Sequence, residues 1–247
     1  MIAALPMYDP LPLRDANDRF WALVREALGY GPARLDRFMP PQAVWRSPAL
    51  VLSQTCSMPY RLGLHGAVHV VAAPDYNLPG CGTGQYNSVL VARRDDPRDA
   101  AALVQARVAV NEAQSQSGYA ALWGWADMRG LRLGPVLVTG GHLASIRAVA
   151  EGRADIAAID AHTWRLACLH DPACARLREL DRTAPAPALP YITALSNDPT
   201  EIADALVTAT EALDGGTRAR LGLRGIVPAD VMGMLALRNP PPLAATL

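Results

Sequence analysis

One stretch, Val110–Tyr119, constrains this chain most, because it joins an apolar run to a helix through two hydroxyls and a glycine. The helix that leaves it is predicted over Ala120–Trp125. Free backbone N–H groups and the helix dipole favour an anion at such a helix N-terminus. Ser115 and Ser117 add O–H donors there, and Gly118 lets the backbone approach a guest closely. The alternative is a serine that only caps an ordinary helix.

The same order of strand, small-residue loop and helix occurs earlier in the chain. Ala49–Gln54 is a short, continuously apolar run of the kind buried on both faces of a parallel sheet, and it leads into the loop Thr55–Tyr60. Ligands of open α/β sheets bind beyond the C-terminal ends of such strands. Further strands are predicted over Ile2–Met7, Val68–Ala73, Tyr86–Arg93, Val108–Val110, Leu133–Val138, Ile156–Ile159 and Tyr191–Leu195.

The predicted helices follow from apolar periodicity and from residues that cap helices. Asp15 or Asn17 is expected to cap the first helix, and Asp198 or Thr200 the helix over Pro199–Leu213. Helices are also predicted from Asp99 through Leu103, over His142–Gly152, from His162 to about His170 and over Pro228–Leu237, and the tail Pro240–Pro242 is expected to be disordered.

The order of elements predicts two α/β lobes joined by two crossing strands, with a cleft between the lobes. We place the first crossing at Tyr86–Arg93 and the return at Thr183–Leu195, which begins with a proline-rich segment. Lobe one is then discontinuous, with residues 1–88 and 190–247, and lobe two contains residues 89–189. A chain of 247 residues is long enough for two such cores.

The charge balance excludes several classes of function. Lys plus Arg and Asp plus Glu number 23 each, which gives no general attraction to nucleic acid or to anionic membranes. All 23 cations are arginine. The absence of lysine excludes Schiff-base chemistry and a Walker-type phosphate loop.

The sequence leaves the compartment open. No apolar stretch reaches the roughly 18 residues of a bilayer span, and residues 1–8 do not resemble a secretory signal, so the protein is either cytoplasmic or exported with a leader outside this sequence. The four cysteines, Cys56, Cys81, Cys168 and Cys174, have no metal-site spacing, and no metal or other cofactor is predicted. Free thiols are expected, whereas disulfides would fit an oxidising compartment.

A second segment carries polar residues at similar places. His142 lies at another predicted helix N-terminus, where an imidazole can donate to an anion or carbonyl, although single histidines often have only a structural role. Asp160 follows four apolar residues at the end of a strand. Its carboxylate either caps the next helix or accepts from a cationic group of a ligand.

Three segments in order resemble a known family. Ser115–Tyr119, Gly141–Ile146 and Ala150–Asp160 look like the corresponding parts of phosphonate and phosphate substrate-binding proteins of ABC transporters, which have the type 2 periplasmic-binding-protein fold. The resemblance extends from the first strand to Tyr191. Gln116 departs from the family, which usually has a third hydroxyl there.

The resemblance implies a solute-binding protein that captures a small anion by hinge closure of its two lobes. It assigns the anion to Ser115, Gln116, Ser117, Gly118 and His142, and a ligand ammonium to Asp160. Aromatic and thiol side chains are expected to line the cleft: Tyr8, Cys56, Tyr60 and Tyr86.

The resemblance also implies a periplasmic monomer that serves an ABC permease, without membrane insertion and without catalysis. Two alternatives stay open at this point. One is a cytoplasmic enzyme on the same scaffold, either like chorismate dehydratase or with Cys56 as nucleophile and His142 as base. The other is a ligand sensor that acts with a regulator.

Overall fold

The computed structural model describes residues 1–243, and its contacts divide the chain into two compact α/β units. Unit 1 contains Met1–Gln85 and Pro187–Leu235. Unit 2 contains Tyr86–Ala186 and, among the described residues, 236–243. The chain therefore passes from one unit to the other three times. The α/β class is confirmed, while the lobe boundaries inferred from the sequence stay a prediction.

Unit 1 is built on a mixed five-stranded sheet with the order β1-β2-β11-β3-β12. The strands are β1 (Ile2–Ala4), β2 (Leu50–Gln54), β3 (Val68–Asp75), β11 (Tyr191–Ala194) and β12 (Gly225–Val227). β1 runs parallel to β2, whereas β11 is antiparallel to both of its neighbours, β2 and β3. The strand through which the chain re-enters unit 1 thus breaks the parallel pattern.

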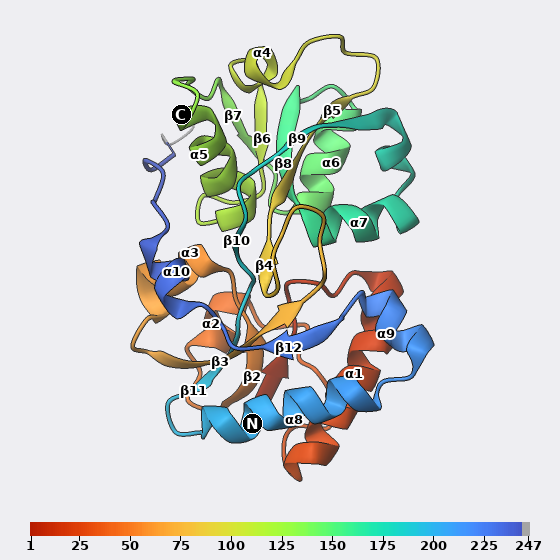
Figure 1. Ribbon diagram of the computed structural model, residues 1–247, viewed down its shortest axis with the longest axis vertical. Helices are drawn as coiled ribbons and strands as arrows, with labels where there is room; N and C mark the ends of the chain where they lie inside the picture. Colours follow the sequence, from red (N-terminus) through yellow and green to blue (C-terminus); the bar gives the residue numbers. More distant parts are fainter. Residues whose placement is uncertain (244–247) are drawn as a thin grey trace. The chain divides into compact units, whose positions relative to one another are not determined.

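The two long helices of unit 1, α1 (Arg14–Leu28) and α8 (Pro199–Ala212), bury apolar side chains on one face. The other helices are α2 (Pro41–Trp45), α3 (Ser57–Pro59), the π-helix η2 (Tyr60–Leu64), α9 (Gly215–Leu221) and α10 (Val231–Ala236), with the 3₁₀ turn η1 (Leu11–Leu13) before α1. In α1, helical spacing puts Phe20, Trp21 and Val24 in the core. α1 packs against α8, and α8 packs against β3 (Figure 1).

The predicted cap of α1 is wrong. Leu13 occupies the N-cap position, and no side chain caps this helix. The side chain of Asn17 donates instead to Tyr8 O and to Asp9 Oδ1, both at 2.9 Å. Asp15 forms an ion pair with Arg220 of α9, with 2.6 Å between Oδ1 and Nη2. Both polar side chains are therefore used in tertiary contacts.

Unit 2 is also built on a mixed five-stranded sheet, with the order β7-β6-β8-β5-β9. Its strands are β5 (Ser88–Arg93), β6 (Val108–Val110), β7 (Val136–Val138), β8 (Ile156–Asp160) and β9 (Leu177–Arg182). β6 is parallel to β7 and β8, and β5 is antiparallel to β8 and β9. β4 (Gln85–Tyr86) and β10 (Ala186–Pro187) pair with each other where the chain crosses between the units.

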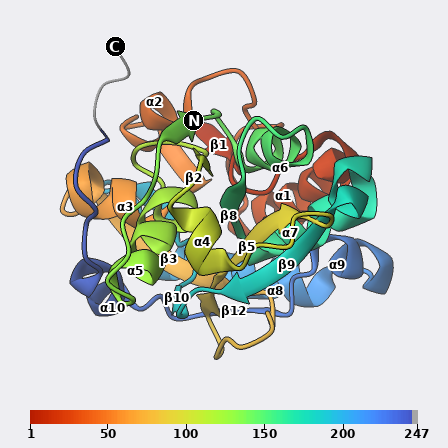
Figure 2. The same ribbon diagram turned by 90° about the horizontal axis from the view of Figure 1, so that it is seen from above.

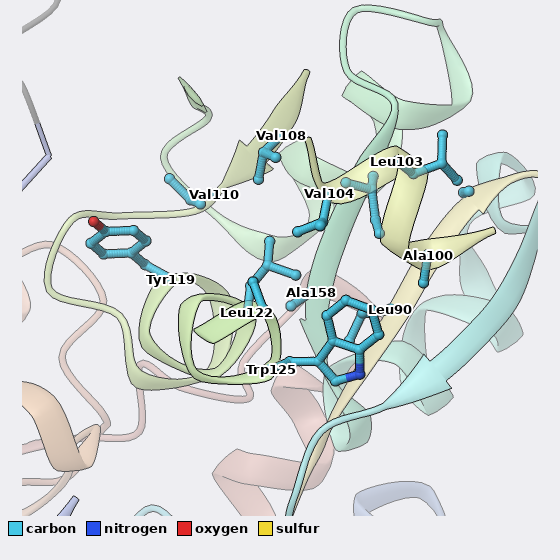
Figure 3. Close-up of a cluster of buried hydrophobic side chains, with 13 residues drawn as sticks. Leu90, Ala100, Leu103, Val104, Val108, Val110, Tyr119, Leu122, Trp125 and Ala158 are labelled. Carbon is cyan, nitrogen blue, oxygen red and sulfur yellow. The ribbon is translucent and has the colours of Figure 1, made fainter. Parts of the chain in front are cut away.

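Helices cover both faces of the unit 2 sheet, which explains why its inner strands β6 and β8 are continuous apolar runs. α4 (Ala100–Val104) and α5 (Ala121–Asp127) lie on one face, and α6 (His142–Ala150) and α7 (Ala161–His170) lie on the other (Figure 2). Leu90 of β5 packs with Leu122 and Trp125 of α5 in a buried cluster (Figure 3). Each such side chain contributes about 1.5–3 kcal/mol on burial.

Local signals missed several elements and misjudged the C-terminal tail. Among the elements that were not predicted are α2, β9, α9 and β12, because β9 is rich in charge and the other three are short. The tail at Pro240–Pro242 is not disordered, since Tyr119 donates a 2.6 Å hydrogen bond to the carbonyl of Pro241. Arg238 of the same segment pairs with Asp127 of α5. None of the helices within residues 1–243 has the length and apolar character that a bilayer span requires.

Candidate functional site

We call Ser115–Gly118 the serine loop; it follows β6 and lies at the N-terminus of a continuous helical segment. The π-helix η3 (Gln116–Ala120) runs directly into α5, and Ser115 caps it by accepting a 2.9 Å hydrogen bond from Gly118 N. Gln116, Ser117 and Gly118 are all buried. The first amides of a helix have no intrahelical acceptor. The capping role considered for a serine is thus confirmed for Ser115, and Ser117 is a separate hydroxyl.

A second helix N-terminus meets this loop through one hydrogen bond. His142 is the first residue of α6, and its Nε2 lies 2.7 Å from Ser117 Oγ. The carbonyl of Gly141 accepts from Ser145 N, so the amides of residues 142–144 precede the first intrahelical bond of α6. Two segments 25 residues apart in sequence therefore bring two helix N-termini together.

The Ser117–His142 pair can offer only one hydrogen to a ligand. If Nε2–H donates to Ser117 Oγ, the hydroxyl hydrogen can go to a ligand or to Ser115 Oγ, 3.5 Å away. If the hydroxyl donates to Nε2, the imidazole carries its hydrogen on Nδ1, a buried atom that has no hydrogen-bond partner among residues 1–243. Either arrangement leaves one donor, from the serine or from the histidine, for an acceptor.

Three polar residues that the sequence did not single out hold this geometry. Ser88, at the start of β5, donates 2.9 Å from its Oγ to the carbonyl of Ser117. Thr139 Oγ1 lies 2.6 Å from Ser145 Oγ and donates to Val110 O, so it joins α6 to β6. Asn111 directly follows β6. Ligands of open α/β sheets bind beyond such strand ends, and this position is the sequence signal that could have identified Asn111.

Gly118 is required by the packing of Asn111. A Cβ atom on Gly118 would lie 1.8 Å from Asn111 Oδ1 and 2.8 Å from its Cγ. Asn111 Oδ1 is buried and has no hydrogen-bond partner in the part of the chain that the structure describes. The glycine therefore allows a side chain, as well as the backbone, to approach closely.

Asp160 is buried at the end of β8, and its Oδ1 accepts a 2.9 Å hydrogen bond from Thr163 N. The helix-capping alternative is thus confirmed, with α7 beginning at Ala161 rather than His162. Ser88 is the register partner of Asp160 across β5 and β8. The carboxylate therefore lies at the same end of the β5–β8 strand pair as Ser88, which hydrogen-bonds to the serine loop.

The expected aromatic residues lie in separate surroundings. Tyr8 of unit 1 packs edge-to-face on Tyr76, with 5.3 Å between ring centroids. The hydroxyl of Tyr60 lies 3.0 Å from His65 Nδ1, and burial raises the pKa of Tyr60. Tyr86 is buried in unit 2 at the first crossing. Tyr76, which the sequence reasoning missed, follows β3 in unit 1.

Cys56 is buried in unit 1 at the N-cap position of α3. Its proposed basic partner, His142, belongs to unit 2, where its Nε2 is engaged by Ser117. All four cysteines are free thiols, as the sequence led us to expect.

The environment of His142 predicts a pH dependence of stability. Desolvation lowers its pKa from 6.5 to about 4, so the neutral imidazole is favoured in the folded protein. Between these values the unfolded chain binds more protons, and stability falls as the pH falls from 6.5 to 4, by at most about 1.4 kcal/mol per pH unit. Urea unfolding at pH values from 7.5 to 4 should show a smaller loss of the free energy of unfolding for His142→Gln than for the original protein.

The matched control is His170→Gln, at the exposed end of α7 in the same unit. We expect this variant to lose stability in parallel with the original protein. If the free energy of unfolding of His142→Gln also falls in parallel with that of the original protein, the imidazole is not desolvated.

The architecture is shared with solved binding proteins. XAC2383 from Xanthomonas citri, solved with bound chloride, is 17% identical, with 96% of each chain covered and a TM-score of 0.69. A binding protein component of an ABC phosphonate transporter from Pseudomonas aeruginosa is 15% identical, with 95% of this chain and 82% of that chain covered and a TM-score of 0.73. PhnD1 from Prochlorococcus marinus, solved with methylphosphonate, is 16% identical, with 94% of each chain covered and a TM-score of 0.71.

The fold is that of the type 2 periplasmic binding proteins. The sequence matches no curated protein. The family model for the phosphonate periplasmic substrate-binding proteins of ABC transporters matches residues 54–232, and the chain belongs to this family. The function and the family inferred from the sequence are therefore confirmed at the level of a solute-binding protein for ABC-type transport.

Proposed function

We propose that this protein binds a small phosphonate- or phosphate-like anion at the serine loop of unit 2. The observation that carries the proposal is the 2.7 Å hydrogen bond between Ser117 Oγ and His142 Nε2, which joins the N-termini of two helical segments. Each helix N-terminus presents free amides and a partial positive charge of about half an elementary charge. Both favour an anion without a charged side chain.

The proposed contacts are shared among hydroxyl, amide and imidazole groups. Ser117 and His142 supply one hydrogen between them, and the amides of Ser117 and His142 supply others. Ser115 is the less available hydroxyl, because its Oγ already accepts from Gly118 N, yet its own hydrogen is not used by that bond. Gln116 and Gly118 complete the loop. Charge-assisted bonds of this kind contribute roughly 1.5–3 kcal/mol each.

Asp160 extends the proposal to ligands that also carry a cation. Its Oδ1 caps α7, and we assign to its carboxylate charge the recognition of a ligand ammonium. Tyr8, Cys56, Tyr60 and Tyr86 stay our candidates for further ligand contacts.

The transport role follows from the family, and its details belong to the proposal. We infer that the protein acts as a periplasmic monomer, that its two lobes enclose the anion by hinge closure, and that it delivers the anion unchanged to a permease. Binding without turnover separates this function from an enzyme on the same scaffold. A product formed from bound ligand, and lost in Cys56→Ala, would favour the enzyme.

The ligand class is tested by a thermal-shift screen. The compounds are phosphate, phosphite, methylphosphonate, 2-aminoethylphosphonate, sulfonates and carboxylates. A ligand at 100 times its dissociation constant adds about 2.7 kcal/mol to the free energy of unfolding, which gives a clear rise in melting temperature. We expect rises with phosphorus anions. Rises with carboxylates or sulfonates alone would mean that the ligand class is wrong.

Asp160→Asn is expected to discriminate between ligands. Asparagine caps helices about as well as aspartate, so α7 should keep its start and the variant should keep its fold. Removal of the charge should weaken 2-aminoethylphosphonate about tenfold or more and leave methylphosphonate unchanged in titration calorimetry. An equal loss for both ligands would show that Asp160 acts only on the anion or on the fold.

A further inference from the structure

Two cysteines outside the serine loop meet at the joint between α7 and the 3₁₀ segment η4 (Pro172–Arg176) in unit 2. Cys168 lies in the last turns of α7 and Cys174 lies in η4. Their thiols share a side-chain hydrogen bond. Cys168 is exposed, whereas Cys174 is 7% exposed. The pair thus joins an exposed cysteine to a buried one through a hydrogen bond between their thiols.

Asp171, which lies between the two cysteines, makes three interactions that fix this segment. Its side chain accepts from Ala173 N at 2.9 Å and so caps η4. Its own amide donates to Ala167 O at 2.7 Å, which closes the end of α7. Its Oδ2 also pairs with Arg147 Nε of α6 at 3.0 Å. The segment between the two cysteines is therefore fixed to both α7 and α6.

We propose that Cys168 and Cys174 form an intrachain disulfide when the folded protein meets a small disulfide oxidant such as glutathione disulfide. The Cys168 thiolate attacks one sulfur of the oxidant and releases one thiolate of glutathione. Cys174 then loses its proton and attacks Cys168 Sγ, which releases the second glutathione. Two cysteine thiols are oxidised, one oxidant disulfide is reduced to two thiols, and the two protons pass to the leaving thiolates.

The order of the two attacks follows from exposure and burial. Burial raises the pKa of both thiols, and it raises the pKa of Cys174 to about 12. Cys174 is therefore a poor first nucleophile at neutral pH, while Cys168 is accessible and captures the oxidant. The hydrogen bond between the thiols makes the two sulfurs neighbours, as a disulfide requires. Such a bond persists in oxidising compartments, where the proteins of this family act.

Peptide mass analysis of the folded protein tests the proposal. Reduced, desalted protein is incubated with glutathione disulfide, unfolded in iodoacetamide and digested with trypsin. The chain has no lysine and no arginine between Arg165 and Arg176, so both cysteines fall in the single peptide Leu166–Arg176. We expect this peptide to be lighter by two hydrogen atoms and to be free of alkylation. Alkylation of both cysteines, or glutathione retained on Cys168, would overturn the proposal.

Variants separate this pair from the other two cysteines. Cys174→Ser should retain glutathione on Cys168, because the attacking thiol is missing. A double variant with Cys56→Ser and Cys81→Ser should form the disulfide as the original protein does. A disulfide that forms equally fast in urea-unfolded protein would show that the folded joint is not its cause. No part of this test depends on the ligand.

Discussion

Gly118→Ala is expected to abolish most anion binding while leaving a folded protein. The new Cβ would lie 1.8 Å from Asn111 Oδ1 and 2.8 Å from Asn111 Cγ, so the Asn111 side chain, the serine loop or both must shift. Such overpacking costs about 1–3 kcal/mol of stability. The displaced loop should lose roughly a hundredfold in affinity for its phosphorus anion, equivalent to about two charge-assisted hydrogen bonds. Titration calorimetry and urea unfolding measure the two effects.

Gly124→Ala provides a matched control from α5, the helix that continues the serine loop. A Cβ on Gly124 meets no atom within 4 Å. The substitution should raise stability by about 0.5–1 kcal/mol, because alanine is the better helix former, and it should leave affinity unchanged. Equal affinity of Gly118→Ala and Gly124→Ala for the anion would show that the serine loop is not part of the binding site.

Ser117→Ala is expected to weaken binding of the phosphorus anion by about 1–3 kcal/mol, the cost of one charge-assisted donor. His142→Ala should cost a similar amount. Since the two side chains share one hydrogen for the ligand, the double variant should lose less than the sum of the single variants, with a coupling of about 1–2 kcal/mol. Calorimetric dissociation constants of the four proteins complete the cycle.

Ser196→Ala is the control for the serine substitution, because Ser196 is exposed after β11 in unit 1. It should leave affinity unchanged. Strict additivity of the two losses would mean that Ser117 and His142 contact the anion independently. An unchanged affinity in Ser117→Ala would contradict the assignment of the hydroxyl to the ligand.

Features with a local physical signal were predicted well. Asp160 and Asp198, each one of two alternatives, cap their helices, and Asp99 does so at the end of the segment Asp95–Asp99 that was predicted to cap the next helix. A carboxylate before a helix accepts from the first amides within its own turn. Continuous apolar runs marked β2 and β8, since a strand covered on both faces needs apolar side chains at every position.

Features that depend on distant packing were missed or wrong. Asn17 looked like a helix cap, yet it bonds to Tyr8 and Asp9 because those groups lie beside it only in the folded unit. β9 carries charge at several positions and was unrecognised, although pairing with β5 makes it a strand. The Pro240–Pro242 tail was expected to be disordered, whereas Tyr119 holds Pro241.

By itself, the sequence determined the α/β class, the serine loop at a helix N-terminus, and the ordered segments that indicate the family. These are properties of neighbouring residues, or of their order along the chain. Only the tertiary structure decided that β5 and β11 run antiparallel within their sheets, that Ser88 holds the Ser117 carbonyl, and that His142 meets Ser117. The physical reason is that these contacts join side chains 25 or more residues apart in sequence, and no local pattern records which distant groups the folded sheet brings within hydrogen-bond distance.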